Sequence, residues 1–252
     1  MPTFDLKNKT ILVTGGGRGI GREVVCKLAG LGAQIIIVGR NQKDLDQVAL
    51  AHPNQIIGMQ ADLSNPDEVD RIISQINKSH NDLSVLINNA GIQFEVDYLS
   101  EGPQKHITGV RTEIGLNIDA VSSLTIGLLP TLKAQEQAVV VNISSGFAIA
   151  PNEKLPVYSA TKAYVSSFST GLRYQCQSTA PQVQILDAIL DLVETDMTRD
   201  TNTGGMNPQD AAAAIVGGIQ SGKSKVWVGR TKFLRVINLI CPPLARKILR
   251  SS

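Results

Sequence analysis

Short apolar runs rich in β-branched residues alternate along the chain with longer segments in which apolar residues recur at helical spacing. The runs predict strands at Thr10–Thr14, Gln34–Val38, Gln55–Gln60, Val85–Asn88, Ala138–Ile143, Gln182–Ile189 and Lys225–Val228. The segments between them predict helices from about Ile20 to Leu31 and at Pro66–Ser79, Thr112–Lys133, Val157–Ser178 and Pro208–Gln220. Strands apolar on both faces and joined by crossover helices are typical of a parallel sheet. We therefore expect an α/β fold, a single doubly wound Rossmann-like domain with a parallel seven-stranded sheet and helices on both faces.

The chain is long enough for one such domain, and its last part differs from the rest in charge. It has 252 residues, of which 42% are hydrophobic, and a net charge of +2. From Gly222 to Ser252 there are eight basic residues and no acidic one. We expect residues 1–229 to form a dinucleotide-binding catalytic domain and residues 230–252 an apolar, basic C-terminal extension. This extension could cover its own domain or the substrate mouth, make a subunit contact or lie on an anionic membrane surface.

Other partners and sites are disfavoured by composition. A net charge of +2 gives no reason to expect nucleic-acid binding. Cys26, Cys176 and Cys241 are widely spaced and lie near no histidine cluster, so we expect no disulfide framework and no metal site. The N-terminus lacks the apolar stretch of a signal peptide, and a cytoplasmic protein is expected.

The first strand runs directly into a glycine-rich turn, Thr14 to Gly21, and then into the first helix. Glycines let the backbone approach a pyrophosphate, and the helix N-terminus offers free N–H groups. The spacing is TGxxxGxG and not GxGxxG, so an ordinary tight turn is the alternative, which the position after the first strand disfavours. The candidate cofactor-binding residues of this turn are Thr14, Gly15, Arg18, Gly19, Ile20 and Gly21.

The end of the second strand indicates which dinucleotide is bound. An acidic residue there would bind the 2′-hydroxyl of the adenosine ribose, but this strand ends in Val38-Gly39-Arg40. The Arg40 guanidinium could hold a 2′-phosphate bidentately, and Arg18 could approach the same phosphate from the other side. The pair favours NADP(H) over NAD(H); the alternative is that both arginines are solvated surface residues.

Four separated motifs occur in one characteristic order. They are Thr14–Gly21, Asn88-Asn89-Ala90-Gly91, a serine within Asn142–Ser145, and Tyr158-Ser159-Ala160-Thr161-Lys162. With them the sequence resembles the short-chain dehydrogenase/reductase family from about Lys7 to Thr198. The resemblance implies an oxidoreductase that transfers a hydride between NADP(H) and a small-molecule carbonyl or secondary alcohol, and a homodimer or homotetramer.

Tyr158 and Lys162 are the candidate proton-transfer residues. They stand at i and i+4 of a predicted helix and therefore share one face, although this spacing alone is common. An unperturbed phenol has a pKa of about 10, and we expect the neighbouring ammonium, together with the positive nicotinamide ring of the oxidised cofactor, to lower it. Tyr158 would then be the general acid in reduction and the base in oxidation. By resemblance, Lys162 would also hold the nicotinamide ribose.

A second donor is needed to polarise the substrate oxygen as hydride arrives. Ser145 stands 13 residues before Tyr158, which is the spacing of the family. Ser144 is the alternative, but it alternates to the other face of the strand. We therefore expect Ser145 to be the catalytic serine.

The resemblance adds further site residues. Asn117 would anchor a water that links Lys162 to solvent, with a capping or surface asparagine as the alternative. Asp62, which could instead cap the helix near Pro66, and Leu63 would border the adenine. The remaining cofactor contacts implied are Asn89, Ala90 and Gly91 near the adenosine and ribose, and Thr195 at the carboxamide.

The sequence departs from the family after the sixth strand, where Leu190-Asp191 replaces the usual Pro-Gly. One hypothesis is that Asp191 lies near the nicotinamide ring and favours its cationic, oxidised form. Two other functions stay open beside the enzyme. One is a non-catalytic NADP(H)-binding sensor or interaction protein on the same fold. The other is a membrane-surface protein that depends on its basic extension.

Overall fold

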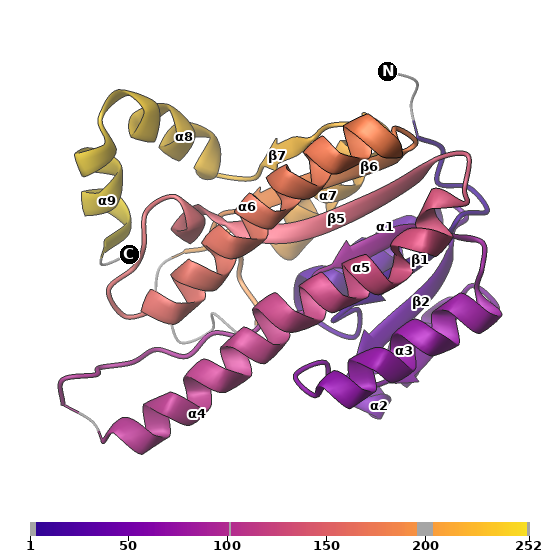
Figure 1. Ribbon diagram of the computed structural model, residues 1–252, viewed down its shortest axis with the longest axis horizontal. Coiled ribbons are helices and arrows are strands. Elements are labelled where there is room, and N and C mark those ends of the chain that lie inside the picture. Colours follow the sequence, from indigo (N-terminus) through magenta and orange to yellow (C-terminus); the bar gives the residue numbers. More distant parts are fainter. Residues whose placement is uncertain (1–3, 101, 196–203, 251–252) are drawn as a thin grey trace.

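A single parallel sheet organises the molecule (Figure 1). The computed structural model describes residues 4–100, 102–195 and 204–250. The strand order in the seven-stranded sheet is β3-β2-β1-β4-β5-β6-β7. The strands are β1 (Thr10–Thr14), β2 (Gln34–Gly39), β3 (Ile56–Gln60), β4 (Leu83–Asn88), β5 (Ala138–Ser145), β6 (Val183–Leu190) and β7 (Lys225–Trp227). The expected doubly wound parallel sheet is confirmed, with strand ends moved by at most two residues.

Helices cover both faces of the sheet. On one face lie α1 (Gly19–Gly30), α2 (Gln42–Ala51) and α7 (Pro208–Gln220). On the other face lie α3 (Pro66–Ser79), α5 (Ala120–Lys133) and α6 (Pro156–Thr179). The central strands contact the helices on both faces. In β1, Ile11 and Val13 pack against the first group of helices and Leu12 packs against the second. This alternation makes the strands apolar throughout.

Among the helices that precede β7, two differ from the sequence expectation. The helix α2 was not predicted; it is short, begins after Asn41, whose side chain accepts a hydrogen bond from the Lys43 N–H, and buries only Leu45 and Val48. The helix predicted to begin at Thr112 begins much earlier, as α4 (Pro103–Ile114). It continues through a π-helical turn η1 (Gly115–Asp119) into α5. The buried residues of α4 are His106 and Glu113. Its apolar residues Ile107, Val110 and Ile114 recur at helical spacing but are exposed or half-buried, and the sequence interpretation overlooked them.

The continuous helix from Pro103 to Lys133 is long and apolar enough, by length and composition, to cross a membrane. Its second half, however, packs in the interior of the molecule. Leu124, Leu128 and Leu132 of α5 belong to the core that includes α3 and the sheet. This is the position of a core helix.

The chain ends in two short helices that lie beyond β7, apart from the two covering layers (Figure 1). They are α8 (Thr231–Ile240) and α9 (Pro242–Arg250). Only Thr231, Leu234 and Ala245 are buried among their described residues. The α9 backbone is tied to the segment that follows β5 and η2 (Gly146–Ala148), because the carbonyls of Leu249 and Arg250 accept hydrogen bonds from the Asn152 side chain and the Glu153 N–H.

Candidate active site

The glycine-rich turn lies at the carboxyl end of β1 and forms the entrance to α1. Gly15 and Gly19 adopt φ values of +67° and +55°, which favour glycine. A Cβ at Gly21 would collide with the carbonyl oxygen of Gly15. The turn is therefore folded tightly enough to admit only glycine at these places, and the N-terminus of α1 is open to an anion.

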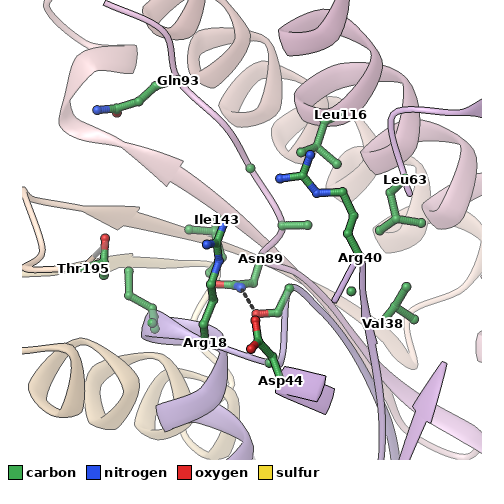
Figure 2. A pocket seen from close by; sticks show the side chains of 18 of the residues that line it. Arg18, Val38, Arg40, Asp44, Leu63, Asn89, Gln93, Leu116, Ile143 and Thr195 are labelled. Atoms are coloured by element: carbon green, nitrogen blue, oxygen red, sulfur yellow. Dashed lines mark hydrogen bonds between the residues drawn. The ribbon is translucent and has the colours of Figure 1, made fainter. Parts of the chain in front are cut away.

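Thr14 and Asn89 hold the turn against the end of β4. The Thr14 hydroxyl oxygen accepts hydrogen bonds from the N–H groups of Asn89 and Ala90, each at 3.0 Å. The Asn89 amide donates to the Thr14 carbonyl at 3.0 Å. It also donates to the Gly15 carbonyl at 3.3 Å, and this bond is the dashed line at Asn89 in Figure 2. Thr14, predicted as a cofactor contact, thus lies behind the turn and supports it.

A cleft of about 880 Å³ runs along the carboxyl edge of the sheet from this turn to α6. It is lined by all of the predicted cofactor residues except Thr14, that is by Gly15, Arg18, Gly19, Ile20, Gly21, Arg40, Asp62, Leu63, Asn89, Ala90, Gly91, Tyr158, Lys162 and Thr195. The sequence interpretation missed further lining residues, including Lys43, Asp44, Gln93 and Leu116. None of these belongs to a motif, and they are found only once the chain is folded.

One end of the cleft is rich in positive charge. The exposed side chains of Arg18, Arg40 and Lys43 line it, and Figure 2 shows both guanidinium groups at the cleft. The N-terminus of α2 adds N–H groups beside Lys43. Asp44 is the acidic residue nearest to this group in the chain and also lines the cleft. An anionic group would be held here between two elements, the glycine-rich turn and the start of α2.

Asp62 lies at this end of the cleft and does not cap α3. The cap of α3 is Asn65, whose side chain accepts a hydrogen bond from the Asp67 N–H at 3.1 Å. Burial acts to raise the pKa of Asp62, but hydrogen bonds from Ser64 and the positive charge of Arg40 outweigh it and lower the pKa. The carboxylate is therefore held in its charged form beside Arg40.

Ser145, Tyr158 and Lys162 come together at the other end of the cleft. Ser145 is the last residue of β5, and Tyr158 and Lys162 lie in the first turns of α6. The Lys162 Nζ lies 5.5 Å from the centre of the Tyr158 ring and donates to the Ile143 carbonyl at 2.9 Å. Ser145 lies close enough to Tyr158 to favour its phenolate, and this effect acts to lower the Tyr158 pKa against the larger effect of burial, which raises it. The Ser144 hydroxyl, in contrast, donates to the buried Asp187.

Burial dominates the titration of this cluster. It lowers the pKa of Lys162 to about 8, against the opposing effect of Asp187. It also raises the pKa of Tyr158 well above its ordinary value, and the negative charge of Glu113 acts in the same direction. The expectation that Lys162 lowers the pKa of the phenol is therefore wrong for the protein alone. The desolvation of the phenolate is the larger effect.

Glu113 is a part of the site that no sequence signal indicated. It lies on α4 with only 3% of its surface exposed, and its Oε1 accepts a hydrogen bond from the Phe94 N–H at 2.9 Å. Burial raises the pKa of its carboxyl group. It holds the segment after β4 against α4 and places a carboxyl group close enough to affect Tyr158.

Asn117 lies in the π-helical turn and is buried, so the surface alternative is wrong. Its Oδ1 accepts from the Ile92 N–H at 3.0 Å, and its Nδ2 donates to the Ile92 carbonyl at 2.8 Å and to the Thr161 hydroxyl at 3.1 Å. A Cβ at Gly91 would lie 3.4 Å from both the Asn117 Oδ1 and the Lys162 Nζ. Asn117 thus lies next to the cluster without lining the cleft.

Asp191 and Thr195 border the cleft after β6. The Asp191 carboxylate accepts hydrogen bonds from the Arg230 backbone N–H at 2.9 Å and from its side-chain Nε at 2.8 Å. The hypothesis that Asp191 favours a cationic ring loses its basis, because its charge is paired with that of Arg230. Thr195 packs beside Gly19, where a Cβ would lie 3.4 Å from the Thr195 methyl group.

A glycine-lined nucleotide cleft that ends in a Ser, Tyr and Lys cluster defines a class of protein, the dinucleotide-binding α/β oxidoreductases. Residues 9–205 match the model of the short chain dehydrogenase family, and the chain belongs to that family. It is 32% identical over 236 residues to the uncharacterized oxidoreductase DltE of Bacillus subtilis, with 91% of this chain and 92% of that one covered.

Solved structures agree in fold. A short chain dehydrogenase from Burkholderia cenocepacia, in complex with NADP, superposes with a TM-score of 0.85 at 20% identity and covers 99% of this chain and 100% of that one. A short chain dehydrogenase/reductase from Burkholderia phymatum, in complex with NAD, has a TM-score of 0.85 at 18% identity and covers 98% and 97%. At such identities the likeness shows the fold alone.

Proposed function

We propose that this protein is an NADP(H)-dependent oxidoreductase that interconverts a small-molecule carbonyl and a secondary alcohol. The observation that carries the proposal is that one cleft has functional side chains at both of its ends. Ser145, Tyr158 and Lys162 meet at one end, and the glycine-rich turn with its cations lies at the other. The B. cenocepacia structure, solved with NADP, supports a dinucleotide in this fold.

The residues present fit a dinucleotide. The turn around Gly15 and Gly21 leaves no room for a Cβ, and such a bare backbone suits the close approach of a pyrophosphate. Arg18, Arg40 and Lys43 offer positive charge for a 2′-phosphate, and a guanidinium binds phosphate bidentately. These cations favour NADP(H) over NAD(H).

The protein residues have separate tasks in the reaction. The nicotinamide, when bound, supplies or accepts the hydride. The Tyr158 hydroxyl, whose raised pKa keeps it protonated, donates its proton to the substrate oxygen during reduction. Ser145 donates a second hydrogen bond to that oxygen. Lys162, buried and held by Ile143, supplies positive charge that stabilises the phenolate left behind. Asn117 fixes the segment around Ile92 and Thr161 on which this arrangement rests.

The test is a panel of ketones and aldehydes screened for consumption of NADPH and, separately, NADH. We expect turnover with at least one class of carbonyl and a higher kcat/KM with NADPH. Tight NADPH binding with no turnover across the panel, and no loss of cellular function in the Tyr158→Phe variant, would instead favour the non-catalytic sensor. Equal use of the two cofactors would contradict the assignment of Arg18, Arg40 and Lys43.

A further inference from the structure

The two C-terminal helices expose an unusual amount of apolar surface. Leu239 is 84% exposed, Ile240 77% and Phe233 71%. We call the C-terminal surface the set of exposed apolar side chains on α8 and α9, namely Phe233, Val236, Leu239, Ile240, Leu244 and Ile248. Exposed apolar side chains gathered on two adjacent helices indicate an interaction site.

The apolar side chains of α8 share one face. Phe233, Val236 and Ile240 are spaced at i, i+3 and i+7, so they lie on the same side of the helix. The opposite side is anchored, because Leu234 is buried against Gly146 and the Arg235 guanidinium lies 5.5 Å from the Trp227 ring. The inner face therefore attaches α8 to the domain, and the apolar outer face is available.

Basic side chains border this surface. Lys232, Arg246 and Lys247 are exposed, and the sequence from Gly222 to Ser252 holds eight basic residues and no acidic one. On α9, Arg246, Lys247 and Arg250 occupy one side and Leu244 and Ile248 another. Apolar side chains flanked by lysine and arginine, on a short helix, are typical of helices that lie in the plane of a membrane interface.

The charge distribution decides between a bilayer and a second copy of the chain. A two-fold interface places the same patch on both subunits, so the basic groups of one subunit would lie near those of the other. Like charges brought together in this way oppose association. The headgroups of an anionic leaflet attract the same cations, while the apolar side chains enter the acyl boundary.

We propose that the C-terminal surface docks the protein on anionic lipid bilayers. The docked helices would remain connected to the active-site region, because α8 contacts Gly146 and α9 binds the segment at Asn152 and Glu153. The cleft residue Phe147 lies between these two attachments. The proposal does not depend on the reaction catalysed.

The experiment is sedimentation of the full chain with vesicles of phosphatidylcholine alone and of phosphatidylcholine mixed with phosphatidylglycerol. We expect binding to the mixed vesicles only, and weaker binding as salt is raised, because screening shortens the reach of the charges. Binding to neutral vesicles as strong as to anionic ones, or no binding to either, would overturn the proposal.

Two sets of variants separate the contributions. The triple change Lys232→Gln, Arg246→Gln and Lys247→Gln should weaken binding to mixed vesicles on the order of 100-fold. A matched control, Lys7→Gln, Lys27→Gln and Lys78→Gln, removes three exposed lysines elsewhere and should bind as the wild type does. Equal losses in both triple variants would show general charge attraction and contradict a defined surface.

The apolar part is tested by Phe233→Ser with Ile240→Ser, which should abolish binding while the melting temperature and NADPH binding of the protein are retained. Sedimentation equilibrium without lipid gives the second readout. If the wild type is a dimer and this variant a monomer, while neither binds vesicles, the surface is a subunit interface and the proposal is wrong.

Discussion

In the proposed function, the two ends of the cleft recognise and react by opposite physical means. At the phosphate end, Arg18, Arg40 and Lys43 are exposed to water and act through the number of their charges. At the chemical end, Lys162 and Ser145 are only 5% and 9% exposed. Water screens charges at the first end and is excluded from the second, where each charge acts more strongly. Recognition is therefore spread over several side chains, and the chemistry depends on single groups.

The largest effect is expected from Tyr158→Phe, which removes the hydroxyl that exchanges the proton. The kcat should fall by about 1,000-fold, within the range for loss of a general acid. NADPH affinity should change little, as measured by fluorescence titration. Tyr164→Phe is the control, since Tyr164 lies on the same helix but is hydrogen-bonded to Ser122. If Tyr158→Phe retained turnover, the chemistry would not depend on this single hydroxyl, and the contrast drawn between the two ends of the cleft would be wrong.

Lys162→Met tests the cost of burying a charge. In the folded protein burial lowers the pKa of Lys162 from 10.5 to about 8, so between these values the unfolded chain holds more protons and stability rises with pH. At about pH 7, burying this charge lowers the free energy of unfolding by up to about 3 kcal/mol. The change to methionine removes that cost, but it also removes the hydrogen bond to Ile143, which reduces the gain in stability by about 1 kcal/mol.

The cofactor-free Lys162→Met variant should therefore be more stable than the wild type at neutral pH and inactive. Its advantage should shrink as the pH rises through this interval, as urea unfolding can measure. Lys78→Met, at an exposed position on α3, is the control. A variant less stable than the wild type at neutral pH would show that the Lys162 ammonium is not strained by burial.

Arg40→Gln tests the exposed end. Loss of one charge-assisted hydrogen-bonding group should raise the Kd for NADPH about 10- to 100-fold and leave that for NADH nearly unchanged. Arg111→Gln, at an exposed position on α4, serves as the control. A parallel loss of both affinities would mean that Arg40 supports the fold of the site and does not select the cofactor.

The smallest effect is expected from Glu113→Gln. The glutamine oxygen can still accept the hydrogen bond from Phe94, but the negative charge that raises the pKa of Tyr158 is gone. The pH limb of alcohol oxidation that reports the phenol should move to lower pH, by less than about one unit. Glu136→Gln, which is exposed, should leave the limb in place. An unmoved limb in Glu113→Gln would argue against electrostatic coupling of the two groups.

Much of the fold could be predicted because its strands are apolar on both faces and its motifs stand at strand ends. The turn at Thr14–Gly21 and the pair Tyr158 and Lys162 lie where their sequence neighbours placed them. The helix α4 was not predicted, although Ile107, Val110 and Ile114 recur in it at helical spacing; the residues by which it packs are instead His106 and Glu113. Periodicity detects apolar faces and not polar ones.

The site could be predicted in its members but not in its electrostatics. The pKa of Tyr158 depends on how deeply the ring is buried and on Glu113, which is distant in sequence. In the same way, Asp191 pairs with Arg230, a partner 39 residues away. Such contacts follow from tertiary packing, and no local pattern records them.

Transfer of label from the cofactor tests the central claim most directly. The protein is incubated with NADPH that carries deuterium at both positions of the reactive carbon and with a carbonyl found active in the panel, and the alcohol is analysed by mass spectrometry. The wild type should place deuterium on the former carbonyl carbon, and Tyr158→Phe should form almost no labelled alcohol. Oxidation of the cofactor with no deuterium in the product would contradict hydride transfer within this cleft.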